Sequence, residues 1–165
     1  MFYKIKEWPR QIRQGIKSLI IWFPVIWRDR NWDNFYIYQI LRHKLHLTEQ
    51  LIRNHGHHLY HIEDANKIKI CVTLLDRLIK DEYHENVFKN HYKKWGEPNM
   101  NFKDWGEAPN YKVLEIKYPN VKTEKDKELQ SKQFRLKSKL EAAMREQDLD
   151  LLFILMRKHI QGWWD

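Results

Sequence analysis

The chain has 165 residues, of which 42% are hydrophobic and 32% charged, a balance typical of a folded domain and not of a disordered chain. Its net charge of +8 favours anionic partners such as nucleic acid, nucleotides or anionic lipid. The count of only five glycines and five prolines argues against an all-β chain, because such a chain needs many turns. The length predicts one domain, spanning residues 1–165.

Residues 4–22 form the first predicted helix, because apolar residues recur there at three- and four-residue steps. Pro9 is expected in or before its first turn, and Pro24 to end or kink it. Residues 1–30 carry seven Lys or Arg side chains against two acidic ones, a net charge of +5. This basic amphipathic pattern fits a first helix packed on a core, and it also resembles an interfacial membrane anchor.

Two further helices are predicted from residue 33 to about 54 and from about 63 to 92. Asp33 is a suitable N-cap for the first of them, and Gly56 a natural stop. Lys44 follows apolar residues of this helix by three and four positions, which predicts a stem directed towards the core. Its ammonium would then lie in an enclosed, ring-lined space near an anion, unless the side chain snorkels to the surface.

Residues 95–122 contain two glycines and three prolines, so we expect a long loop. Its segment 111–116 alternates as a strand would, but a single strand has no sheet to join. A fourth helix should follow Thr123, capped with the help of Asp126, and a last helix should start near Asp148. The predicted fold is all-α: a compact single-domain bundle of about five helices with one long Gly- and Pro-containing loop.

The single cysteine, Cys71, excludes an intrachain disulfide and fits a reducing compartment. Its apolar neighbours Ile70 and Leu74 predict a core position, not a nucleophile. No signal peptide is recognisable, and the apolar run Leu19–Trp27 is much shorter than the ~20 residues of a membrane-spanning helix. We therefore expect a cytoplasmic protein without a transmembrane segment.

The chain has eight tryptophans, and seven of them lie in three clusters along the chain, among lysines and arginines. Bases stack on such rings and phosphates pair with such cations, although the same rings are also what a small core is built from. Arg28 and Arg30 precede a predicted helix N-terminus. Helix N-termini bind phosphates, and guanidinium groups match the geometry of phosphate oxygens. The candidate ligand-binding residues are Trp27, Arg28, Arg30, Trp32, Tyr36, Lys44, His91, Lys94, Trp95, Trp163 and Trp164.

Motifs of catalysis are missing from the sequence. It contains no Gly-x-Ser-x-Gly, Walker loop, Gly-x-Gly-x-x-Gly or His-Glu-x-x-His segment. Only Asp81-x-x-His84 approaches a di-metal motif, and it occurs once. We therefore predict a protein that is not an enzyme, with no cofactor and no metal.

Four segments, residues 22–33, 74–78, 91–96 and 163–165, resemble a group of small proteins from bacteriophage and gut metagenome sequences. The resemblance implies a phage source, and with it the cytoplasm of a host cell. It also implies the classes to which small phage proteins belong: virion or replication accessories and counter-defence proteins. One counter-defence class consists of sponges that sequester cyclic-nucleotide or ADP-ribose-type immune signals.

Three functions follow as hypotheses. The first is a non-catalytic binder of a small anionic nucleotide, a sponge of this kind. The second is a nucleic-acid-binding accessory protein, favoured by the charge and the basic first helix. The third is a structural or protein-interaction module of a phage, in which exposed aromatics form an interface and the chain can form a homo-oligomer.

Overall fold

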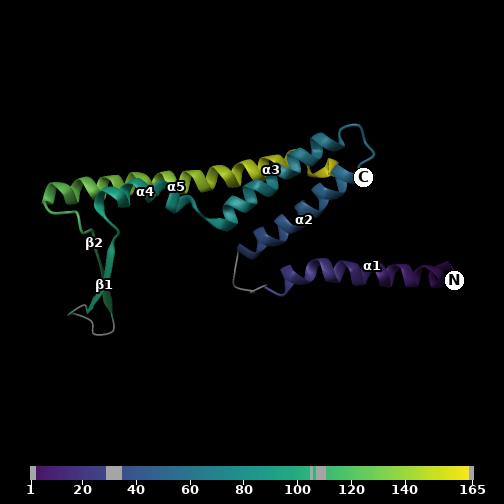
Figure 1. The fold of residues 1–165 in the computed structure, drawn as a ribbon, viewed down its shortest axis with the longest axis horizontal. Helices are drawn as coiled ribbons and strands as arrows, with labels where there is room; N and C mark the ends of the chain where they lie inside the picture. The colour runs from purple at the N-terminus through teal and green to yellow at the C-terminus, as the bar shows by residue number, and fades with distance from the viewer. Residues whose placement is uncertain (1–2, 29–34, 105, 107–110, 164–165) are drawn as a thin grey trace. The chain divides into compact units, whose positions relative to one another are not determined.

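The computed structural model describes residues 3–28, 35–104, 106 and 111–163, and the side chains from Trp8 onwards within these ranges. Within them the chain is mainly helical, as predicted, with one small antiparallel hairpin (Figure 1). Its contacts form two compact units. One unit comprises residues 1–79 and 152–165, and the other residues 80–151.

The first unit contains α1 (Tyr3–Ile26), α2 (Phe35–His55) and most of α3 (His61–Lys80). It also contains the end of α5 and the short 3-10 turn η1 (Ile160–Gly162). Helix α1 is longer than predicted and includes both of its prolines. Gly56 ends α2 as predicted, its backbone N–H donating to the Ile52 carbonyl at 2.9 Å.

Helices α2 and α3 lie antiparallel. Two side-chain hydrogen bonds show this, because an early residue of α2 pairs with a late residue of α3, and a late residue of α2 with an early residue of α3. Arg42 donates to Asp76 at 2.5 Å, and Arg53 donates to Asn66 at 3.0 Å. The core of this unit consists of buried apolar side chains from α2, α3 and the end of α5. Its members are Leu45, Ile52, Ala65, Ile68, Cys71, Val72, Leu74, Leu75, Leu78 and Leu152.

Cys71 lies in this core, as predicted. It is fully buried, and burial raises the pKa of its thiol to about 11. The thiol is therefore protonated at neutral pH and behaves as a small apolar side chain.

The second unit contains α4 (Tyr83–Trp95), β1 (Asn99–Asp104), β2 (Lys112–Lys117) and most of α5 (Glu124–His159). Figure 1 shows α4 beside α5, with the hairpin projecting from the end of this pair. The hairpin corrects the prediction of a structureless loop over residues 95–122. The alternating segment after residue 111 does pair, and its partner is β1, in a register that joins Phe102 to Leu114.

The helix boundaries correct the sequence prediction at two further places. The helix predicted over residues 63–92 is divided, because Asp81 has a left-handed backbone with φ of 50° and ends α3. The fourth and last predicted helices are instead one helix, α5. Asp148, the expected start of the last helix, lies buried within α5 and accepts a hydrogen bond from the Tyr83 hydroxyl at 2.6 Å.

Candidate functional site

The first turn of α5 is fixed by the cap that the sequence predicted. The Asp126 backbone N–H donates to Thr123 Oγ1 at 3.1 Å, and the Thr123 backbone N–H donates to Asp126 Oδ2 at 3.0 Å. The Thr123 hydroxyl also donates to Asp126 Oδ2 at 2.8 Å, and this bond, with the one from the Thr123 backbone, lowers the pKa of the Asp126 carboxyl. The cap thereby fixes where α5 begins.

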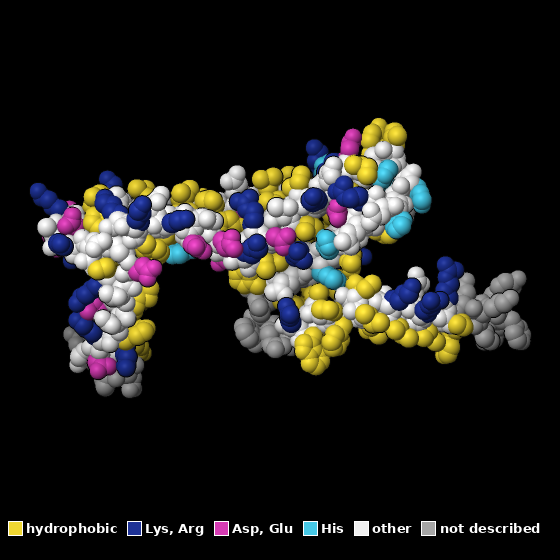
Figure 2. All heavy atoms as spheres, in the orientation of Figure 1, with side chains coloured by type: hydrophobic (Ala, Val, Ile, Leu, Met, Phe, Trp, Pro, Cys, Tyr) yellow, Lys and Arg dark blue, Asp and Glu magenta, His cyan; other side chains and the backbone are white. Residues whose placement is uncertain are grey.

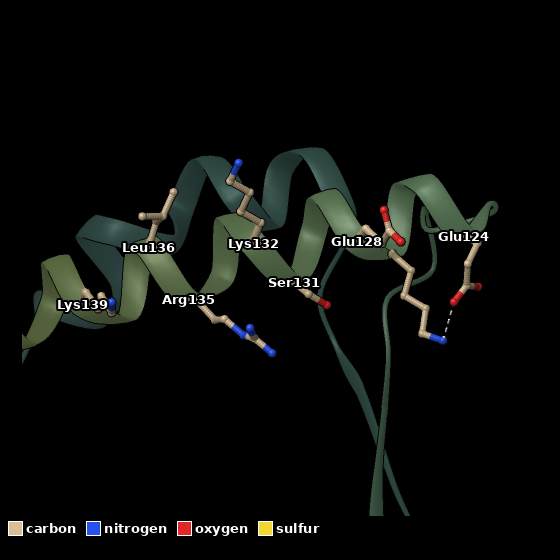
Figure 3. A pocket seen from close by; sticks show the side chains of 8 residues that line it. Glu124, Glu128, Ser131, Lys132, Arg135, Leu136 and Lys139 are labelled. Carbon is tan, nitrogen blue, oxygen red and sulfur yellow. Dashed lines mark hydrogen bonds and ion pairs between the residues drawn. The ribbon is translucent and has the colours of Figure 1, made fainter.

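Three cations lie at helical spacing on the exposed part of α5: Lys132, Arg135 and Lys139, here called the cationic face. They line a concavity of about 520 Å³ together with Ser131 and Leu136 among others. Figure 3 shows Ser131 and Arg135 extending to one side of the helix and Lys132 and Leu136 to the other. All lining side chains come from α5 itself, so the concavity is an open helix surface and not an enclosed pocket.

The three cations of the cationic face share their concavity with two carboxylates, Glu124 and Glu128. The ion pair that borders it joins Lys127 to Glu124 at 3.0 Å. Across the part of the chain that the structure describes, no carboxylate lies within ion-pair distance of Lys132, Arg135 or Lys139. Because these side chains are exposed and unpaired, they are available to an external anion.

A second concavity of about 300 Å³ adjoins this face, and Arg135 lines both. Its wall includes two partly exposed rings, Tyr118 and Phe134, and the strand residue Ile116; we call it the ring depression. Aromatic rings therefore lie next to unpaired cations, the combination that suits a base with its phosphate.

The two rings are held from beneath by α4. Phe134 packs against Phe88 with 5.2 Å between ring centroids, and Tyr118 meets the His91 ring edge-on at 5.7 Å. His91 is buried, and burial, with the charges of Lys137 and Lys94, lowers the pKa of its imidazole. His91 is therefore neutral at pH 7 and serves as part of the support under the rings.

Helix α4 also carries two other residues proposed from the sequence. Trp95 is buried and donates from Nε1 to Gln133 at 2.8 Å, so its ring belongs to the α4–α5 core. The Lys94 ammonium is exposed and lies 4.4 Å from the centre of the Trp95 ring. The structure thus joins Lys94 to Trp95 and places His91 beneath the depression.

Lys44 does not occupy the enclosed space that was predicted for it. Its side chain is exposed, and so are Ile37 and Ile40 on the same side of α2. The buried side of α2 instead passes through Leu45 and Ile52. Since successive residues differ by about 100° around a helix, Lys44 lies well away from the core direction.

The remaining candidates of the first unit are not gathered around one pocket. Trp27 is 72% exposed at the end of α1, with the exposed Arg28 beside it. Tyr36 is only 5% exposed, and its hydroxyl donates to the Val25 carbonyl. Trp163, another candidate ligand contact, is buried. Arg30, Trp32 and Trp164 lie outside the described residues.

Sequence reasoning missed both the cationic face and the ring depression. A signal for the face was present, because residues 129–140 contain four cations and no acidic residue. The depression had no such signal, since Tyr118 and Phe134 are sixteen positions apart and meet through the hairpin and α5.

Within the described ranges no three His, Cys, Asp or Glu side chains gather as a metal site would require. The helices described there include none with the length and apolarity to span a membrane. No protein-family model, curated protein or solved structure matches the chain.

Proposed function

We propose that the chain binds single-stranded nucleic acid, without catalysing a reaction, through the cationic face and the ring depression of the second unit. The observation that carries the proposal is that Arg135 lines both concavities, so unpaired cations and partly exposed rings form one continuous surface. Phosphates would lie along Lys132, Arg135 and Lys139. Bases would stack on Tyr118 and Phe134.

The openness of this surface favours a polymer over a small ligand. Pockets for small molecules bury most of their ligand, whereas the cationic face is the open surface of a single helix. A strand of nucleic acid can follow such a surface and collect several modest contacts, each of them electrostatic or stacking. The net charge of +8 acts in the same direction by attracting polyanions over a distance.

The test is a titration of a labelled single-stranded oligonucleotide, followed by fluorescence anisotropy. The variant Lys132→Gln/Arg135→Gln/Lys139→Gln should lose at least about tenfold in affinity, because three phosphate contacts are removed. The slope of log affinity against log salt should become shallower by about 2, since each contact in a single strand contributes about 0.7. Tyr118→Leu or Phe134→Leu should each weaken binding about tenfold through lost stacking.

A matched control removes the same three charges elsewhere, in Lys69→Gln/Lys80→Gln/Lys158→Gln, where all three side chains are exposed. The control should retain most of the affinity. Equal losses in the two triple variants would show that net charge alone attracts the oligonucleotide and would reject the proposed surface.

The predicted sponge for a small anionic nucleotide shares the same chemistry of ring and cation, and it has its own arm in the experiment. Calorimetry with cyclic dinucleotides and ADP-ribose derivatives would show tight binding that depends little on salt. That result, together with weak oligonucleotide binding, would replace the nucleic acid by a sequestered nucleotide.

A further inference from the structure

Helix α1 has an apolar side that no other described residue covers. Its apolar side chains occupy about 120° of the helix circumference, the width of a face that is normally buried. Yet Trp8 is 68% exposed and Leu19 is 66% exposed. Figure 2 shows these hydrophobic side chains gathered along one side of the helix. The members of this apolar arc are Trp8, Ile12, Ile16, Leu19, Ile20, Phe23, Ile26 and Trp27.

Contact with α2 does not cover the arc, because α2 meets a different side of α1. The Trp22 ring lies edge-on to His43 at 4.9 Å, and the Val25 carbonyl accepts the Tyr36 hydroxyl. Trp22 and Val25 are the two partly buried residues of α1 among those whose side chains are described. They lie on the opposite half of the helix from the apolar arc.

The charges of α1 indicate what covers the arc. Residues 8–28 contain four cations and no Asp or Glu. Arg13 and Lys17 directly adjoin the apolar arc, and together they line an open concavity that is otherwise largely apolar, with Trp8 and Ile12 among its residues. A partner for this side must therefore offer an apolar surface bordered by negative charge.

A second copy of α1 does not meet that requirement. Pairing two apolar arcs would bring the cations that border them together, with no acidic residue between positions 8 and 28 to neutralise them. A bilayer with anionic headgroups does meet it. Apolar side chains enter the acyl region, lysine and arginine stems reach up to the phosphates, and tryptophans at both ends of the arc suit the interface.

We infer that α1 is an interfacial helix that lies in the plane of an anionic membrane with its apolar arc inserted. The helix does not cross the bilayer, in agreement with the absence of any membrane-spanning helix from the described residues. This inference is independent of the proposed nucleic-acid surface, which belongs to the other unit.

The experiment is co-sedimentation of the full chain with vesicles. The protein should pellet with equimolar phosphatidylcholine and phosphatidylglycerol, and at least about tenfold less with phosphatidylcholine alone, because headgroup charge is part of the recognition. The variant Ile16→Gln/Leu19→Gln/Phe23→Gln should lose binding at least about tenfold, since it removes apolar burial. A second variant, Arg13→Gln/Lys17→Gln, should lose mainly the preference for anionic vesicles.

The matched control is Leu59→Gln/Ile62→Gln/Ile70→Gln, which changes three exposed apolar residues on other parts of the same unit. It should bind vesicles as the unchanged protein does, and circular dichroism should show native helix content in every variant. Failure of the unchanged protein to pellet, or equal loss in the control, would overturn the inference. A stable dimer in light scattering that the α1 triple variant abolishes would assign the arc to a second copy instead. Oligonucleotide affinity measured on the same variants keeps this result separate from the proposed function.

Discussion

His91 illustrates how a residue chosen as a ligand contact from the sequence acquires another role in the fold. The pattern of aromatic and basic residues around it suggested a binding side chain. In the structure it is enclosed by Phe88, Tyr118 and Phe134, and its Nδ1 has no hydrogen-bond partner among the described residues. Its neutral imidazole fills space under the rings, so protonation should disturb that support.

Stability should therefore depend on pH through His91. Its pKa is lowered in the folded protein, whereas in the unfolded chain it lies near 6.5. As pH falls below about 6.5, the unfolded chain takes up a proton that the folded protein does not, so stability falls until the folded pKa is reached. Thermal melting should show that His91→Gln reduces the loss of Tm between about pH 7.5 and pH 5.5.

The exposed His55 supplies the comparison for this measurement, because His55→Gln removes an imidazole that lies outside the support under the rings. If His91→Gln keeps the full pH dependence, other groups carry the effect and His91 does not titrate as described.

The tryptophans fall into a buried group and an exposed group. Trp95 and Trp163 are core, while Trp8 and Trp27 are exposed at the ends of the apolar arc. The sequence allowed both outcomes, because a ring beside a cation looks the same whether the ring packs inwards or outwards. Burial depends on which side of the helix meets a neighbour, and that is a property of the assembled helices.

At the scale of elements, α4 ends at a glycine whose backbone other residues rarely adopt. Gly96 has φ of 81° and ψ of 166°, and a Cβ there would lie 2.3 Å from Pro119 Cγ. Gly96→Ala should lower the free energy of unfolding by about 1–3 kcal/mol, because alanine is strained in this backbone conformation. Urea titration measures this change. The contact between the end of α4 and the segment after β2 that contains Pro119 should weaken.

Gly15 offers the contrasting substitution, because it lies within α1 and a Cβ there meets no atom within 4 Å. Gly15→Ala should be neutral or raise stability by up to about 1 kcal/mol through helix propensity. A Gly96→Ala variant as stable as the unchanged protein would contradict the strained backbone assigned to this position.

Local signals predicted some elements and could not predict others. Gly56 and the cap at Thr123 were predictable, because each acts through its own backbone and near neighbours. The break between α3 and α4 at Asp81 could not be predicted, because no glycine or proline lies near it and the helical spacing of apolar residues continues across it. Strand β1 is rich in Asn, Lys and Asp, so only its pairing with β2 makes it a strand.

At the scale of the whole molecule, the cations and exposed apolar residues are distributed over two surfaces with different physics. In the proposed function the cationic face would contact phosphates and release counterions, so its binding should fall steeply with salt. The apolar arc of α1 gains from burial as well as from charge, so raised salt should weaken it only in part. Sequence composition, a net charge of +8 with eight tryptophans, could indicate an anionic partner but not that two separate surfaces would serve two kinds of partner.

These two surfaces should act independently, since they share no side chain and belong to different units. The triple-glutamine variant of the cationic face should bind equimolar phosphatidylcholine and phosphatidylglycerol vesicles within about twofold of the unchanged protein. The α1 triple variant should likewise bind the oligonucleotide within about twofold of the unchanged protein. The physical reason is that free-energy changes at sites without common partners add. A protein with both sets of changes completes a mutant cycle, in which vesicle binding and oligonucleotide affinity are each measured. A combined variant whose losses differ from the sum of the two sets would show that the units are coupled.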